Sequence, residues 1–109
     1  MYAETEIKRL VKELVNKFKP EKVIVFGSQA DGTATENSDI DFCVIVNIEA
    51  LIEKKRELRR EINKYLAYDC DADKPFDLII YAAGEWETLS QNKGDFAHII
   101  KESGVVLHG

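Results

Sequence analysis

The sequence has no long hydrophobic run and few cysteines, and each shortage excludes a class of protein. No stretch approaches the ~18 consecutive apolar residues of a transmembrane helix. The N-terminal residues begin a charged amphipathic segment rather than a signal peptide. Cys43 and Cys70 form no Cys-x-x-Cys pair, so no zinc site is expected. Cys43 lies in an apolar stretch and is expected in the core, whereas a free thiol at Cys70 indicates a reducing compartment. We therefore expect a cytoplasmic protein without a membrane segment.

Basic residues are also in the minority. The chain of 109 residues carries 15 Lys and Arg against 20 Asp and Glu, which gives a net charge of -5 and a pI near 5.0. An acidic surface argues against a broad nucleic-acid-binding footprint. Hydrophobic residues make up 45% and charged residues 32%, as in an ordinary globular domain. At this length we expect one domain, residues 1–109, around a single core.

Hydrophobic periodicity divides the chain into helices and strands. Apolar residues at helical spacing predict a first helix with Thr5 as its N-cap, and a last helix in which Phe96, Ile99 and Ile100 face the core. Continuous apolar runs predict buried strands. The expected strands are 22–26, 39–46, 76–81 and 105–107, and the expected helices are 5–18, 47–68, 85–92 and 95–102. This order predicts a mixed sheet with helices mainly on one face, an α/β (α+β) fold whose other face is open to a ligand.

The second expected helix mixes basic and acidic residues around an apolar stripe. The stripe is expected to begin at Leu51 and Ile52. Basic and acidic residues at i,i+4 spacing favour ion pairs on a solvated face. Arg59 and Arg60 belong to this face, and a contact with phosphate or a partner is the alternative to simple solvation.

A polar loop between the first two expected strands carries the most informative residues. Gly27 lets the backbone turn sharply and approach a ligand. Ser28 offers a hydroxyl and an N–H where a short helix could begin, which suits phosphate oxygens. Ten residues later, Asp39-x-Asp41 opens the next strand. The two carboxylates point to the same face and repel each other unless a cation lies between them, and such oxygen ligands suit Mg²⁺ shared with nucleotide phosphates.

Asp77 is the one charged residue within the third expected strand. A carboxylate between apolar neighbours costs free energy to bury without a partner. Two interpretations remain open: a third metal ligand beside Asp39 and Asp41, or a strand-edge residue with its carboxylate in water.

Gly27-Ser28, ten residues and then Asp39-x-Asp41 resemble the signature of nucleotidyltransferases of the DNA polymerase β-like superfamily. The short chain resembles its minimal nucleotidyltransferase (MNT) group, and the resemblance covers most of the chain. It implies transfer of a nucleoside monophosphate from ATP or another NTP to a hydroxyl. Gly27 and Ser28 would hold phosphates, and Asp39, Asp41 and Asp77 would hold two Mg²⁺ ions, with Mn²⁺ as a substitute. Asp77 would also take the acceptor's proton. The alternative interpretation is a loop closed by turn-forming side chains.

The match departs from the MNT pattern at two positions. The group commonly carries arginines where this chain has Gln29 and Asp31, so two cations that would neutralise a triphosphate are absent. The group's usual partner is a small helical protein of the HEPN class. In that toxin–antitoxin module, the nucleotidyltransferase adenylylates a tyrosine of the toxin.

Three functions therefore remain open for the chain. The first is an adenylyltransferase antitoxin. The second is a non-catalytic nucleotide-binding subunit that neutralises its partner by contact. The third is a small-molecule nucleotidyltransferase, such as one that modifies an antibiotic. A chain of this length cannot wrap a large acceptor, so the acceptor platform is expected from the HEPN-type partner or from a second copy of the chain.

Overall fold

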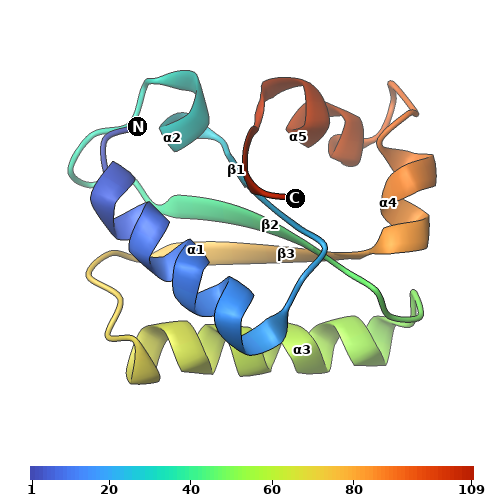
Figure 1. Cartoon of the computed structure of the whole chain (residues 1–109). Coiled ribbons are helices and arrows are strands. Elements are labelled where there is room, and N and C mark those ends of the chain that lie inside the picture. The colour runs from blue at the N-terminus through green and yellow to red at the C-terminus, as the bar shows by residue number, and fades with distance from the viewer.

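The fold is built around a mixed four-stranded sheet in the computed structural model, which describes residues 1–109 (Figure 1). The strands are β1 (Lys22–Phe26), β2 (Ile40–Val46), β3 (Phe76–Ala82) and β4 (Val105–His108). Their order is β3-β2-β1-β4, with β1 antiparallel to β2 and β4, and β2 parallel to β3. The helices are α1 (Glu4–Phe18), α2 (Ser28–Asp31), α3 (Ile52–Lys64), α4 (Ala83–Leu89) and α5 (Phe96–Ser103), and a π-helical turn, η1 (Tyr65–Asp69), extends α3. The expected α+β fold is confirmed.

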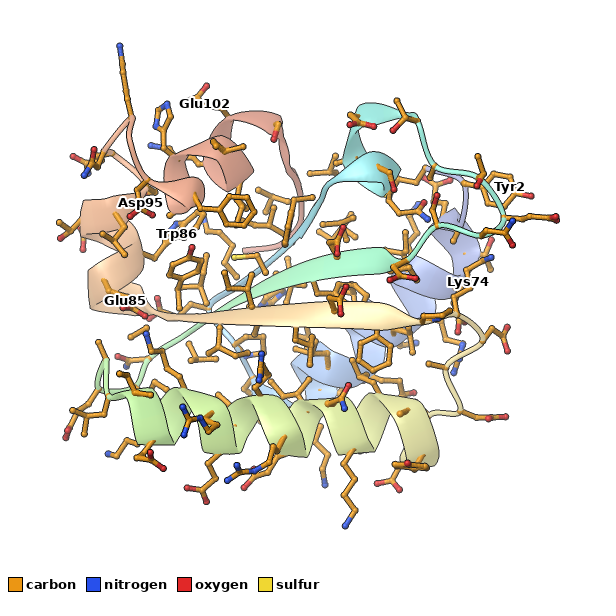
Figure 2. The ribbon with its side chains drawn as sticks, turned by 180° about the vertical axis from the view of Figure 1, so that it is seen from behind. Tyr2, Lys74, Glu85, Trp86, Asp95 and Glu102 are labelled. Carbon is orange, nitrogen blue, oxygen red and sulfur yellow. The ribbon has the colours of Figure 1, made fainter.

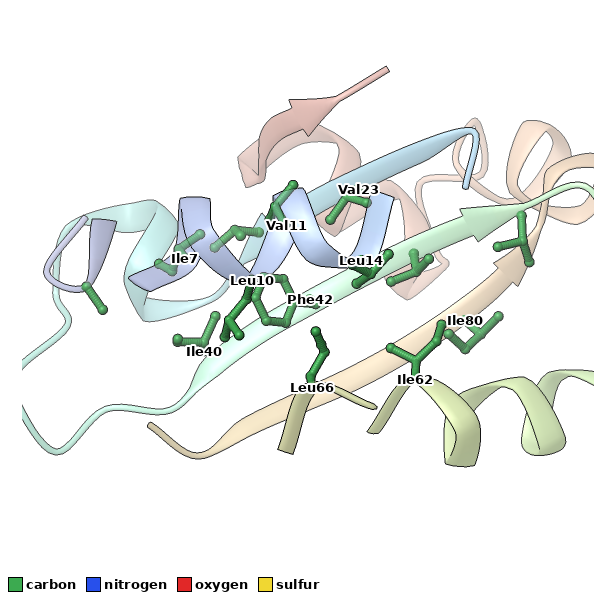
Figure 3. Packing of buried hydrophobic residues seen from close by; sticks show 14 residues of the cluster. Ile7, Leu10, Val11, Leu14, Val23, Ile40, Phe42, Ile62, Leu66 and Ile80 are labelled. Carbon is green, nitrogen blue, oxygen red and sulfur yellow. The ribbon is translucent and has the colours of Figure 1, made fainter. Parts of the chain in front are cut away.

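The two long helices, α1 and α3, cover one face of the sheet and enclose most of the core (Figure 3). Every second residue of β2 points to this face and is buried there: Ile40, Phe42, Val44 and Val46. α1 adds an apolar stripe at helical spacing: Ile7, Leu10, Val11 and Leu14. Because this packing fixes which residues of β2 point inward, it directs Asp41 and Cys43 to the opposite face.

The opposite face is covered only in part (Figure 2). α4 and α5 pack over a second buried cluster that includes Cys43 and Tyr81. Trp86 of α4 lies with its ring centroid 5.2 Å from that of Tyr81. Cys43 is buried as expected, and its burial raises the pKa of the thiol to about 12. Because α4 follows β3 directly, it covers the far ends of β2 and β3 and leaves their first residues open.

All four expected helices begin at other residues than the sequence predicted. α4 begins two residues earlier than expected and α5 one residue later, and the other two differences are larger in consequence. The helix expected at 47–68 begins only at Ile52, because the chain first has to turn from the end of β2 back to the helix layer. Leu51 and Ile52 are 50% and 68% exposed, so the expectation that they are buried is wrong. α1 begins one residue earlier than expected, which places Thr5 inside the helix and not at its N-cap. No helix is both long and apolar enough to cross a membrane.

Candidate active site

Three aspartates meet at the starts of β2 and β3, on the sheet face away from α1 and α3. Asp41 of β2 and Asp77 of β3 are direct partners in the parallel register. Neighbouring strands lie about 4.8 Å apart, so the two carboxylates leave the same face at close range. Asp39 lies just before β2, outside the strand in which it was expected, and its charge still acts on the Asp41 carboxyl. The N–H of Ile40 donates to the carbonyl of Pro75 at 3.1 Å, which ties the two strand starts together.

The three carboxylates lack a balancing cation. Asp39, Asp41 and Asp77 take part in none of the ion pairs of the chain. Burial, followed by the charges of Asp77 and Asp39, raises the pKa of the Asp41 carboxyl above its ordinary value. Asp41 is half-buried, whereas Asp39 and Asp77 are exposed, and β3 is an edge strand. Asp77 thus lies at a strand edge in contact with water and beside Asp41, and its role as a metal ligand stays a prediction.

Gly27 and Ser28 form the turn beside Asp41. Gly27 has a φ of +73°, a left-handed conformation that favours glycine. A Cβ added to it would lie 2.5 Å from Oδ2 of Asp41, so the glycine allows the turn to approach the carboxylate. Ser28 begins the short helix α2, as expected, and its carbonyl accepts the N–H groups of Thr33 and Ala34. The turn therefore lies directly beside the Asp41 carboxylate.

An aromatic pair borders the aspartates, and the sequence analysis missed it. Phe26, the last residue of β1, is the register partner of Asp41, so its ring lies on the aspartate face. Phe96, at the start of α5, stacks edge-to-face on Phe26 with ring centroids 5.7 Å apart. Phe96 and Ile99 are 49% and 55% exposed, so the expectation that both face the core is wrong. The sequence signal was an α5 helix with two adjacent apolar stripes, of which only one is buried.

Comparison with known proteins agrees with this geometry. Residues 7–106 match the family model of the nucleotidyltransferase domain. The chain belongs to this family. No curated protein sequence matches the chain significantly.

Two solved structures share the fold of this nucleotidyltransferase domain. A candidate nucleotidyltransferase from Sulfolobus solfataricus aligns with a TM-score of 0.60 and 21% identity, over 94% of this chain and 76% of that one. A toxin–antitoxin structure with AMP-PNP aligns with a TM-score of 0.50 and 24% identity, over 98% of this chain and 73% of that one. At these identities the likeness shows a common fold.

The two positions that depart from the MNT pattern have different surroundings in the nucleotidyltransferase domain. Gln29 is 1% exposed, its Oε1 accepts the N–H of Ala3 at 3.2 Å, and its Nε2 has no hydrogen-bond partner. An arginine at this position would therefore begin from a buried site rather than from the surface. Asp31 is exposed, and hydrogen bonds from the hydroxyl and N–H of Thr33, at 2.6 and 2.9 Å, lower the pKa of its carboxyl.

The ligand atoms of the site suit a hard cation. Asp39, Asp41 and Asp77 offer carboxylate oxygens only, which Mg²⁺ prefers over nitrogen or sulfur. No three His, Cys, Asp or Glu side chains stand close enough together to enclose an ion by themselves. Mg²⁺ usually binds one or two carboxylates and completes its octahedron with water and substrate phosphates. The three carboxylates could therefore hold Mg²⁺ only together with water or substrate phosphates.

Proposed function

We propose that the chain is a Mg²⁺-dependent nucleotidyltransferase of the MNT group that transfers AMP from ATP to a tyrosine of a HEPN-type partner, and so acts as an antitoxin. One observation carries the proposal: three unpaired aspartates share a sheet face beside the Gly27-Ser28 turn. Membership of the nucleotidyltransferase domain family supports nucleotidyl transfer. The toxin–antitoxin neighbour with AMP-PNP supports a nucleotide substrate and a protein partner.

The proposed reaction exchanges one phosphorus–oxygen bond for another. The acceptor hydroxyl oxygen attacks the α-phosphorus of ATP, the bond from that phosphorus to the bridging oxygen breaks, and pyrophosphate leaves. Asp77, exposed at the sheet edge, takes the hydroxyl proton. Asp39 and Asp41 would hold one Mg²⁺ and share a second with Asp77. When bound, Mg²⁺ neutralises charge on the phosphates and activates the acceptor oxygen.

The turn beside Asp41 would hold the triphosphate in the proposed complex. The backbone at Gly27 and the hydroxyl of Ser28 would contact the β- and γ-phosphates. Ser28 is half-buried, and its backbone carbonyl accepts the hydrogen bonds that follow α2. The short helix therefore does not depend on the Ser28 hydroxyl. Ser28→Ala should therefore weaken ATP binding while leaving the melting temperature nearly unchanged.

A partner would complete the open end of the aspartate face. α4 covers the far ends of β2 and β3, and no element of the chain covers Asp39 or Asp77. Correct positioning of two reactants can contribute about 7–11 kcal/mol to catalysis, so a protein that docks here would raise the rate substantially. We expect little turnover by the chain alone. The HEPN-type partner is our first choice for this platform, and a second copy of the chain is the alternative.

The unpaired thiols of Cys43 and Cys70 suit a reducing compartment. We therefore place the chain and its partner in the cytoplasm.

Neutralisation of the partner by contact alone is the second candidate function. It is favoured by Gln29 and Asp31, which supply no cation for a triphosphate. Modification of a small molecule such as an antibiotic is a third candidate, and no feature of the site favours it over the other two.

Two positions of radiolabel in ATP test the proposal. The chain, Mg²⁺ and the proposed HEPN-type partner are incubated with ATP labelled at the α- or the γ-phosphate. The α-label should move to the partner and the γ-label should not. Asp39→Asn with Asp41→Asn should abolish labelling, whereas a matched pair of exposed acids outside the site, Asp69→Asn with Asp73→Asn, should retain it. No α-label on the partner, with neutralisation retained by the Asp39/Asp41 variant, would replace transfer with contact as the function.

A further inference from the structure

The free edge of β3 is unusually regular for an exposed strand edge. β3 pairs with β2 on one side only, through seven consecutive residue pairs without a bulge. Asp77 is its single charged residue. Exposed edges are usually protected by bulges, charges, prolines, very short strands or a covering helix or loop. The opposite edge follows that rule, since β4 has four residues and its pairing with β1 contains a register shift. Towards its end the β3 edge is closed, because Ile80, Tyr81 and Ala82 are buried and the N–H of Ala82 donates to Glu85. The first part of the edge, from Phe76 to Ile79, is therefore available to pair with another chain.

A groove runs along this edge between β3 and α3. It consists of two adjoining hollows, of about 260 and 250 Å³, which share Arg59 and Leu78 in their linings. β3 supplies one side of this edge groove, from Phe76 to Ile80. α3 supplies the other side and lies alongside β3 in both views (Figures 1 and 2). The edge groove thus presents strand backbone and apolar side chains on one side and a helix face on the other.

The helix side of the edge groove is cationic in a chain whose net charge is -5. Lys55 and Arg56 line it but are each paired with an acid of the chain, Glu85 and Glu53 respectively. Arg59 and Arg60 also line it and take part in none of the ion pairs. Two unpaired guanidinium groups beside an open strand edge favour an acidic ligand. Pairing of two β3 edges about a two-fold axis is disfavoured, because it would bring the same cationic helix faces together.

We propose that the edge groove binds an extended, acidic peptide segment of a partner protein, which adds to β3 as a further strand. The segment's backbone pairs with the outward N–H and C=O groups of β3. Its acidic side chains on the helix side contact Arg59 and Arg60. Asp77 lines the same groove and belongs to the aspartate face. A hydroxyl on the bound segment would therefore lie next to Asp77; this last step alone rests on the proposed function, and the binding itself does not.

Peptide binding without ATP or Mg²⁺ tests the edge groove separately from transfer. The probe is a fluorescent peptide of seven residues in which glutamate and threonine alternate, long enough to span the open part of the β3 edge. Two companions change one property each: lysine replaces glutamate, or alternate backbone nitrogens are methylated to block strand pairing. Fluorescence anisotropy gives the affinity, and amide chemical shifts of the ¹⁵N-labelled chain locate the peptide. We expect the glutamate peptide alone to bind, with shifts along β3.

Charge reversal identifies the cations that carry the binding. Arg59→Glu with Arg60→Glu should weaken the glutamate peptide at least about tenfold, since two charge-assisted contacts are lost. Lys54→Glu with Lys64→Glu, on the same helix but outside the groove, should leave its affinity unchanged. Arg59→Gln with Arg60→Gln gives the same comparison if the reversed variant fails to fold.

Several results would overturn the edge groove as a peptide site. These are equal binding of the methylated peptide, retained affinity in both Arg59/Arg60 variants, and chemical shifts away from β3. Tighter binding of single-stranded RNA than of the glutamate peptide would assign the arginines to a nucleic acid instead. The peptide experiment contains no ATP, so its result is independent of the label-transfer experiment. Peptide binding without label transfer would reject the proposed reaction and retain the groove. The reverse pair of results would reject the groove and retain the reaction.

Discussion

Removal of one charge from the aspartate group should stabilise the fold. Asp41→Asn keeps the shape of the side chain and removes its negative charge. Asp41 forms no ion pair in the chain, and burial together with the charges of Asp77 and Asp39 raises the pKa of its carboxyl. The ionised side chain is therefore less favourable in the folded state than in the unfolded state, and asparagine relieves that cost.

The register of β2 and β3 sets the size of the effect. Carboxylates on strands about 4.8 Å apart repel each other by about 0.9 kcal/mol at the dielectric constant of water and by about 3.5 kcal/mol at an effective value of 20. Asp41 is half-buried and Asp77 is exposed, so the lower value applies. Asp41→Asn should raise the free energy of unfolding at neutral pH by about 1 kcal/mol, which corresponds to about 4 °C in Tm for a domain of this size.

The pH dependence of this gain has a definite sign. Because the pKa of Asp41 is raised by folding, the protonated carboxyl stabilises the fold below its unfolded pKa, and this stabilisation is lost as the pH rises through the folded pKa. The advantage of Asp41→Asn should therefore be largest at neutral pH and vanish in acid. Thermal melts in EDTA over a pH series measure it.

Asp31→Asn is a control with the opposite sign. Hydrogen bonds from Thr33 lower the pKa of the Asp31 carboxyl, so replacing this carboxylate with an amide should reduce the free energy of unfolding at neutral pH. A lower Tm for Asp41→Asn, or a gain that does not change with pH, would refute the electrostatic argument.

Three further perturbations examine the same face. Mg²⁺ or Mn²⁺ at one hundred times its Kd should raise the free energy of unfolding of the wild type by about 2.7 kcal/mol, and its Tm accordingly. The Tm of Asp39→Asn with Asp41→Asn should not change, and equal shifts in both proteins would place the ion elsewhere. Phe96→Ala should weaken ATP binding by about 1–3 kcal/mol if the base stacks on the exposed ring. In calorimetry, Phe96→Ala should bind tripolyphosphate as tightly as the wild type does, and the control Ile99→Ala should bind ATP as tightly as the wild type does. Gly27→Ala should lower the free energy of unfolding by about 1–3 kcal/mol and displace the Asp41 carboxylate, because the glycine has a positive φ and no room for a Cβ. Urea unfolding measures the loss, and an unchanged midpoint would contradict the close approach.

Local sequence patterns were sufficient to predict the elements that carry the site. The strand at 22–26 has the expected bounds, because an apolar run between a proline-ended helix and a glycine turn has few alternatives. Alternation along β2 correctly placed Asp41 on the face opposite Phe42. Sequence alone could not give the parallel register that sets Asp77 beside Asp41, because strand pairing depends on contacts between distant segments.

Burial was the least predictable property. Leu51, Ile52 and Phe96 are apolar but exposed, since hydrophobic side chains also occupy much of an ordinary protein surface. Gln29 shows the reverse: a polar residue in a loop sequence is buried beneath the N-terminal segment. The basic side chains of α3 looked like a solvated face, and only the position of β3 as an edge strand reveals the groove beside them.

Mass spectrometry of the partner measures the proposed reaction most directly. The proposed HEPN-type partner is incubated with Mg²⁺, ATP and either the wild type or the variant Asp39→Asn with Asp41→Asn, and its toxicity is assayed in parallel. We predict that the wild type adds AMP to a tyrosine of the partner and abolishes its toxicity, and that the variant does neither. An unmodified partner that both proteins neutralise equally well would contradict nucleotidyl transfer as the mechanism.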